Sequence, residues 1–199
     1  MNLAAVAEAL SWSALLTSLV ATATLSVLAF LRPRAAYLWF AAGAMAISLM
    51  ASATLGEPAR MGFAPLVTIL AFTAAVFGGS PAAATALRLA MGSVAPGLHG
   101  GIIVTERPTA DEQRMGVTTG TRREVLRGGL TIGVLERIAS AGAIIAGFPE
   151  ALAIVVAVKG VGRFTELEAP EARERFIIGT FASLIWACAA ALVVHLALR

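Results

Sequence analysis

Long apolar runs separated by short polar breaks constrain the fold of this chain more than any other feature of its sequence. The first extends from about Leu10 to Leu31 and contains no charged residue. A helix needs about 20 residues to cross the hydrocarbon core of a bilayer, and lipid forces the backbone of such a run to bond within itself. Charged residues make up only 14% of the chain, against about 25% in soluble domains. The pattern predicts an all-α, polytopic helical membrane protein.

The polar breaks divide the chain into about six transmembrane helices within a single transmembrane domain, residues 1–199. We expect the spans at about residues 10–31, 35–55, 61–79, 124–146, 149–168 and 171–198. Ser80-Pro81 has the pattern of a helix start, which predicts a short separate helix over residues 80–91 at the inner membrane surface. Residues 93–120 are predicted to form a mobile cytoplasmic loop. Thr121 and Glu124 fit a capping box that would begin the fourth span.

Lysine and arginine are distributed unevenly between the predicted loops. Basic residues mark the cytoplasmic side of membrane proteins. If both termini lie outside, the outer side holds only Arg60 and Arg199. Arg137 then lies within a span, and all other basic residues fall on the inner side: Arg32, Arg34, Arg88, Arg107, Arg114, Arg122, Arg123, Arg127, Lys159, Arg163, Arg173 and Arg175. The sequence therefore predicts a multi-pass protein of the plasma membrane with its termini outside.

Four charged residues fall within the predicted fourth and fifth spans, namely Glu136, Arg137, Lys159 and Arg163. If the two spans fold against each other about the turn at Phe148-Pro149, Glu136 faces Val161. Lys159 and Arg163 each lie two residues from Val161. These two basic residues are four apart and share one helix face. A charge left unpaired inside a membrane costs at least about 2.5–3.5 kcal/mol. We therefore predict that Glu136 pairs with Lys159 or Arg163.

Two interpretations of this charged cluster remain open. It could be a salt-bridged clamp that locks the two helices together, or a basic pocket for an anionic group. Three basic residues around one acid exceed what a clamp requires. The leading functional prediction is thus a non-enzymatic membrane protein that binds an anionic lipid headgroup, or an acidic protein partner, through the four residues. A small-solute transporter or transporter subunit is the alternative, and a lipid-modifying enzyme comes third.

Small residues at fourfold spacing predict helix-packing faces in the same part of the chain. Gly129 and Gly133 form one such pair, and Gly179 and Ser183 begin a longer series that continues to Ala191. Small side chains allow helix backbones to approach closely where lipid supplies no hydrophobic driving force. We expect both faces to be buried between helices.

Several catalytic classes lack the residues they need. Asp111 is the only aspartate, which argues against chemistry that uses paired intramembrane aspartates. His99 and His195 lie far apart, and no Cys/His group has the spacing of metal ligands. A serine nucleophile within an apolar span would lack a histidine base. We therefore expect no catalytic residues, no metal, no other cofactor and no nucleic-acid partner.

Three short motifs carry a resemblance to known proteins. They are Arg-Gly-Gly with Ile-Gly-x-Leu-Glu-Arg over residues 127–137, Lys-x-x-x-Arg-Phe over residues 159–164, and Ile-Gly-Thr-x-x-Ser over residues 178–183. This third of the chain resembles an uncharacterised family of small bacterial integral membrane proteins. The resemblance implies a helical bundle in the bacterial inner membrane, and it implies no activity.

Overall fold

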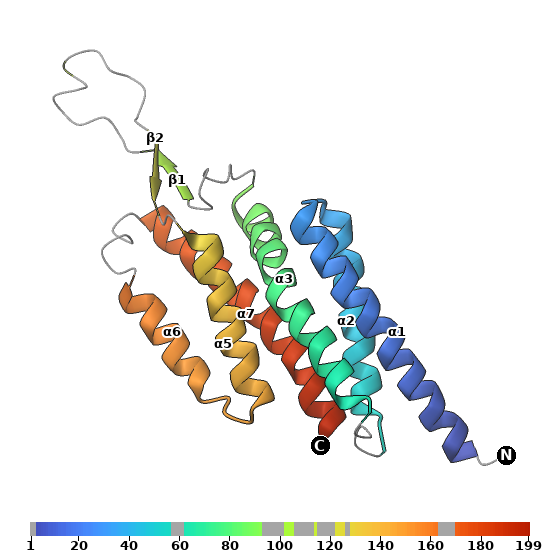
Figure 1. Ribbon diagram of the computed structural model, residues 1–199. Helices are drawn as coiled ribbons and strands as arrows, with labels where there is room; N and C mark the ends of the chain where they lie inside the picture. The colour runs from blue at the N-terminus through green and yellow to red at the C-terminus, as the bar shows by residue number, and fades with distance from the viewer. Residues whose placement is uncertain are drawn as a thin grey trace.

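The computed structural model describes residues 3–56, 62–92, 102–105, 114, 122–125, 128–162 and 170–199. These residues form helices that lie side by side and a short two-stranded sheet (Figure 1). In chain order the elements are α1 (Leu3–Leu31), α2 (Ala35–Ala53), α3 (Ala64–Met91), β1 (Ile102–Thr105), β2 (Arg122–Val125), α5 (Gly129–Ile145), α6 (Ala151–Gly162) and α7 (Pro170–Leu198).

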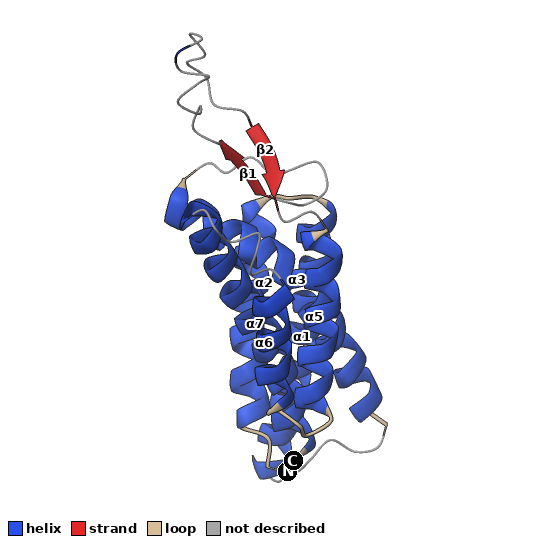
Figure 2. Ribbon diagram, turned by 90° about the vertical axis from the view of Figure 1, so that its left-hand side faces the viewer, coloured by secondary structure: helices blue, strands red, loops and turns tan. Residues whose placement is uncertain are grey.

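Neighbouring helices along the chain run in opposite directions, so both chain ends lie at the same end of the bundle (Figure 1). The two strands project from the opposite end (Figure 2). β1 and β2 pair antiparallel, with Ile102 opposite Val125 and Thr105 opposite Arg122. We refer below to the strand end and the terminal end of the bundle.

Four helices are long and apolar enough to cross a membrane: Val6–Leu31, Ala35–Ala53, Ala64–Met91 and Ala172–Leu198. This confirms the predicted polytopic helical bundle. The remaining two helices are shorter. α5 has 17 residues and α6 has 12, which correspond to about 26 Å and about 18 Å along the helix axis. They form an antiparallel pair beside α7 (Figure 1).

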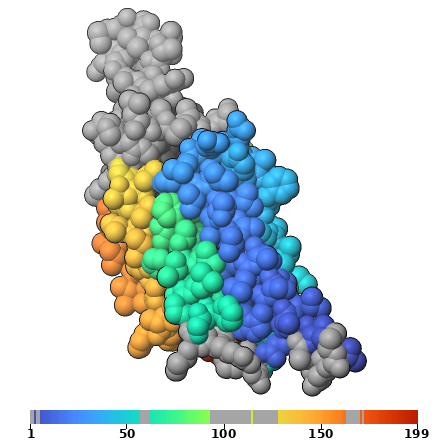
Figure 3. Space-filling model, turned by 45° about the vertical axis from the view of Figure 1, so that its right-hand side comes forward, coloured from blue at the N-terminus to red at the C-terminus, as the bar shows by residue number. Residues whose placement is uncertain are grey.

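Small residues line the contacts between the long helices. α3 lies between α1 on one side and α5 on the other (Figure 3). It also packs against α7. Ala71, Ala74, Ala187 and Ala191 are fully buried in this core. In lipid, the association of helices depends on such close packing and on hydrogen bonds between them. One such bond joins α1 to α2, where the Ser18 and Ser48 hydroxyls lie 2.8 Å apart.

The predicted helix break at Ser80-Pro81 is wrong, because α3 continues through Pro81 to Met91. Proline lacks an N–H and cannot donate to the carbonyl four residues earlier. The carbonyl that loses its donor is that of Phe77, and membrane helices tolerate such a loss within a packed bundle. One turn earlier, the Trp186 indole N–H of α7 donates to the Ala74 carbonyl at 3.0 Å and holds α3 against α7. Residues 80–91 are therefore part of a spanning helix.

The predicted capping box at the start of the fourth span is also wrong. Glu124 lies in β2, and α5 begins only at Gly129, after Gly128 in a left-handed conformation with φ 76°. Thr121 lies outside the described residues. Residues 102–105 of the predicted loop form β1, because their β-branched side chains favour a strand. Apart from Arg114, the rest of that loop lies outside the described residues, as does the predicted fifth span beyond Gly162.

Candidate functional site

Glu136 on α5 forms an ion pair with Lys159 on α6. The Lys159 ammonium donates a hydrogen bond to Glu136 Oε2. Only 11% of the Glu136 side chain and 16% of the Lys159 side chain are exposed. The Lys159 Nζ atom also lies 5.4 Å from the centre of the Phe176 ring. The ion pair confirms one of the two pairings predicted for Glu136, and Arg163, the other predicted partner, lies outside the described residues.

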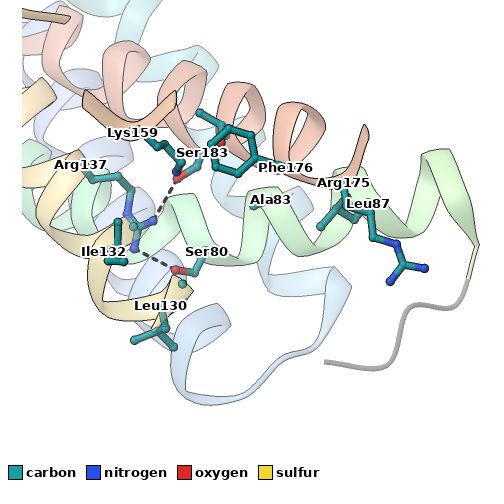
Figure 4. Close-up of a pocket in the computed structure, with 14 residues that line it drawn as sticks. Ser80, Ala83, Leu87, Leu130, Ile132, Arg137, Lys159, Arg175, Phe176 and Ser183 are labelled. Atoms are coloured by element: carbon teal, nitrogen blue, oxygen red, sulfur yellow. Dashed lines mark hydrogen bonds between the residues drawn. The ribbon is translucent and has the colours of Figure 1, made fainter. Parts of the chain in front are cut away.

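Arg137, the next residue of α5, reaches into the bundle instead of toward α6. Its side chain is 2% exposed. Its Nε atom donates to the Val76 carbonyl at 2.7 Å, and its terminal nitrogens donate to Ser183 Oγ at 3.0 Å and Ser80 Oγ at 2.8 Å (Figure 4). Arg137 therefore connects α5 to both α3 and α7.

Glycines on two helices make room for the Arg137 side chain. A Cβ atom added at Gly79 of α3 would overlap Arg137 Cδ and approach Ser183 Oγ to 2.9 Å. A Cβ atom at Gly133 would lie 3.1 Å from an Arg137 terminal nitrogen. The preceding glycine, Gly78, leaves space for the Trp186 ring in the same way. The Gly78-Gly79 pair is thus a recess in α3 that accepts two large side chains.

A cavity of 260 Å³ adjoins Arg137 between α3, α5 and α7, with Lys159 of α6 at its side. Its polar and basic lining consists of Ser80, Arg137, Lys159, Arg175, Thr180 and Ser183. Figure 4 shows the Arg175 guanidinium at the opposite end of the site from Arg137. The remaining lining residues are small or apolar: Ala83, Leu87, Gly129, Leu130, Ile132, Gly133, Phe176 and Gly179.

The charged residues that line this cavity are all basic. Three basic side chains line it, and none of its lining residues is acidic. Within the described residues Arg137 has neutral hydrogen-bond partners and no carboxylate at ion-pairing distance. Each of its terminal nitrogens carries a second N–H hydrogen, which no described residue accepts. A buried cation without a counter-charge is costly, so the site favours an anion.

A second, more apolar hollow of 390 Å³ lies between α5 and α6, and we refer to it as the groove. It is lined by Ile132, Leu135, Glu136, Ala139, Ile154, Val155, Val158, Lys159 and Gly162. Ile132 and Lys159 line both the cavity and this groove. The Oε1 atom of Glu136, another lining residue, is buried and has no hydrogen-bond partner within the described part of the chain.

The glycines and serine predicted to pack helices all line the cavity. Gly129, Gly133, Gly179 and Ser183 are among its walls, and Ser183 also accepts the Arg137 hydrogen bond. A Cβ atom at Gly179 would meet only Leu87 Cδ1, at an ordinary contact distance of 3.6 Å. Gly133 and Ser183 are buried as predicted, whereas Gly129 and Gly179 are only half-buried, because they border the cavity.

Ser80 and Thr180 line the site although the sequence does not predict this. Ser80 follows the Gly78-Gly79 recess and has the local pattern of a helix cap. Two adjacent glycines in an apolar span before a serine could have indicated a large side chain arriving from another helix, because glycine permits such close approach. Thr180 carries no comparable signal.

Chemically, the cavity offers cationic N–H donors and hydroxyl groups. Guanidinium groups hold phosphate and carboxylate oxygens through paired N–H donors. Among the residues that line it there is no histidine, aspartate or cysteine, and the described residues contain no group of three or more potential metal ligands. The site is therefore suited to holding an oxyanion.

Comparison with protein-family models, with curated proteins and with solved structures finds no match to this chain.

Proposed function

We propose that this protein is a bacterial inner-membrane protein that binds a phosphate-type oxyanion, non-enzymatically, in the cavity beside Arg137. The phosphate belongs either to a lipid headgroup or to a soluble molecule. The orientation of the protein, with the strand end in the cytoplasm, is part of the proposal and rests on the uneven distribution of basic residues in the sequence.

The observation that carries the proposal is the buried guanidinium of Arg137, which lines the cavity and has no carboxylate at ion-pairing distance among the described residues. Three neutral acceptors satisfy part of its hydrogen-bonding capacity and none of its charge. A purely structural clamp would need no cavity next to the arginine. A phosphate oxygen at the free N–H hydrogens would supply both the missing acceptors and the missing charge.

The Glu136–Lys159 pair supports an anion of low charge. Because Glu136 neutralises Lys159, Arg137 contributes a net charge close to one unit to its side of the cavity. A singly charged phosphodiester matches this arrangement better than a neutral solute does.

Phosphorus content of the purified protein tests the proposal. The full-length chain would be purified from bacterial membranes in a mild detergent and examined for phosphorus and, by native mass spectrometry, for bound molecules. We expect a phosphate-bearing ligand at about one per chain. A lipid mass and a small-solute mass would distinguish the two sources of phosphate.

Gly179→Leu is the informative variant, because its side chain enters the cavity from α7 and leaves every Arg137 hydrogen bond in place. We expect this variant to fold and to lose the bound phosphate. Gly142→Leu is the matched control, since a Cβ atom at Gly142 meets nothing within 4 Å. The proposal is wrong if the wild-type protein carries no phosphate, or if Gly179→Leu retains it at the wild-type level.

A further inference from the structure

We infer that the ligand is an anionic phospholipid, with its phosphodiester in the cavity beside Arg137 and one acyl chain in the groove between α5 and α6. This inference rests on the proposed anion-binding function and names the source of the phosphate. It follows from the way in which the basic cavity and the apolar groove adjoin each other.

The two hollows meet at Lys159 and Ile132, which line both. On the cavity side of this junction lie Arg137, Ser80 and Ser183. On the groove side, apart from the Glu136–Lys159 pair itself, the walls are small or apolar. A polar, negatively charged group joined to a hydrocarbon chain is the ligand whose chemistry matches this sequence of surfaces.

The groove has a length suited to a lipid chain. On α6 it extends from Gly162 to Ile154, which is about 12 Å at 1.5 Å per residue. One leaflet of a bilayer contributes about half of the roughly 30 Å hydrocarbon core. α6 runs from the terminal end to the strand end of the bundle (Figure 1), so Ile154 marks the deeper part of the groove and Gly162 the part nearest the strand end. The headgroup would lie toward the strand end, and the chain would point toward the middle of the membrane.

Groove residues on α6 are also exposed on the outer surface of the helical bundle. Ile154 is 66% exposed and Val158 is 67% exposed. Apolar side chains exposed on a membrane helix face acyl chains, so a lipid chain can enter the groove sideways from the bilayer. A soluble anion has no apolar part that could pack against this surface.

The positive charge of Arg137, whose hydrogen-bond partners are all neutral, adds a preference among phospholipid headgroups. Phosphatidylglycerol carries a single negative charge, whereas phosphatidylcholine carries no net charge.

The test compares lipids that differ in one feature at a time. Full-length protein, stripped of lipid by detergent exchange, would be titrated with dioleoyl phosphatidylglycerol, dihexanoyl phosphatidylglycerol, dioleoyl phosphatidylcholine and inorganic phosphate. Binding would be followed by native mass spectrometry. We expect the long-chain phosphatidylglycerol to bind about tenfold or more tightly than the short-chain lipid, because only the long chain fills the groove.

Two tryptophan substitutions on α6 locate the chain. Val158 lines the groove and Val156, two residues away, does not. Val158→Trp should remove the preference for the long chain, and Val156→Trp should keep it. Since both valines are exposed, we expect both variants to fold.

The outcomes separate the inference from the proposed function. Equal binding of long-chain and short-chain phosphatidylglycerol, or of dioleoyl phosphatidylcholine and dioleoyl phosphatidylglycerol, overturns the inference and leaves anion binding in place. Equal loss of chain preference in both tryptophan variants also overturns it. Failure of all four ligands to bind overturns the proposed function as well.

Discussion

Glu136 and Arg137 are consecutive residues of α5, yet their side chains leave the helix in different directions and bind different helices. Glu136 pairs with Lys159 on α6, whereas Arg137 donates hydrogen bonds to α3 and α7. Successive residues of a helix are separated by about 100° around its axis, so a neighbouring acid and base need not pair with each other. α5 is therefore attached to three helices by two adjacent charges, and each attachment can be tested separately.

The first prediction concerns the recess in α3. Gly79→Ala should destabilise the protein by about 1–3 kcal/mol or more, because overpacking forces neighbouring groups out of their positions and the new methyl group would overlap Arg137 Cδ. Thermal unfolding in detergent, followed by tryptophan fluorescence, measures this. Gly179→Ala is the control, since its methyl group would meet Leu87 at 3.6 Å. Similar losses in the two variants would contradict the recess.

The second prediction compares two buried serines. Ser183→Ala removes an acceptor from a charged donor and should cost about 1.5–3 kcal/mol of unfolding free energy. Ser26 is also buried, but its hydroxyl has no hydrogen-bond partner within the described residues. Ser26→Ala should therefore leave the unfolding free energy unchanged or raise it. A larger loss at Ser26 than at Ser183 would show that the Arg137–Ser183 bond contributes little.

The third prediction concerns the ion pair between α5 and α6. Glu136→Leu leaves the Lys159 ammonium without its carboxylate and should cost about 3–5 kcal/mol. The double variant Glu136→Leu with Lys159→Met should be more stable than Glu136→Leu alone, because exchanging a buried pair for apolar side chains is often neutral. Melting temperatures of the two variants in one detergent decide the matter. A double variant that unfolds below the single variant would rule out neutralisation as the role of Glu136.

The fourth prediction concerns Gly78 and Trp186. A Cβ atom at Gly78 would overlap the Trp186 indole, so Gly78→Ala should destabilise strongly in the wild type and weakly in a Trp186→Leu background. We expect a coupling of about 0.5–3 kcal/mol between the two changes in a double-mutant cycle. Gly43→Ala, whose methyl group meets nothing within 4 Å, should combine additively with Trp186→Leu. Additivity for Gly78 and Trp186 would contradict the contact.

The fifth prediction concerns orientation in the membrane. Arg34 lies between α1 and α2 at the strand end of the bundle, and Glu150 lies between α5 and α6 at the terminal end. In a Cys188→Ala background, a membrane-impermeant thiol reagent applied to intact cells should label Glu150→Cys and not Arg34→Cys. The opposite result would reverse the proposed orientation.

The proximity of Glu136 and Lys159 can be predicted from the sequence. Two antiparallel helices joined by a tight turn have a register that can be counted outward from the turn, and this count placed the two residues near each other. The same count says nothing about Arg137, whose acceptors on α3 and α7 come from distant parts of the chain.

The continuity of α3 through Pro81 cannot be predicted from the sequence, because it also depends on distant parts of the chain. Ser80-Pro81 carries a local signal for a helix start. In the bundle, Arg137 of α5 and Trp186 of α7 donate to the carbonyls of Val76 and Ala74 and hold the turn before Pro81 against two other helices. These contacts form only once the helices are assembled, so a purely local pattern predicts a break that the structure does not have.

The position of Arg137 also has a consequence for the order in which the chain is made. Its acceptor Ser183 is 46 residues further along the chain, and a ribosome that adds about 5–20 residues per second reaches it after about 2–9 seconds. During that interval α3 is complete and Ser183 has not been made, so the guanidinium has only part of its final surroundings. Arg137 can therefore complete its hydrogen bonds only after the first half of α7 has been synthesised.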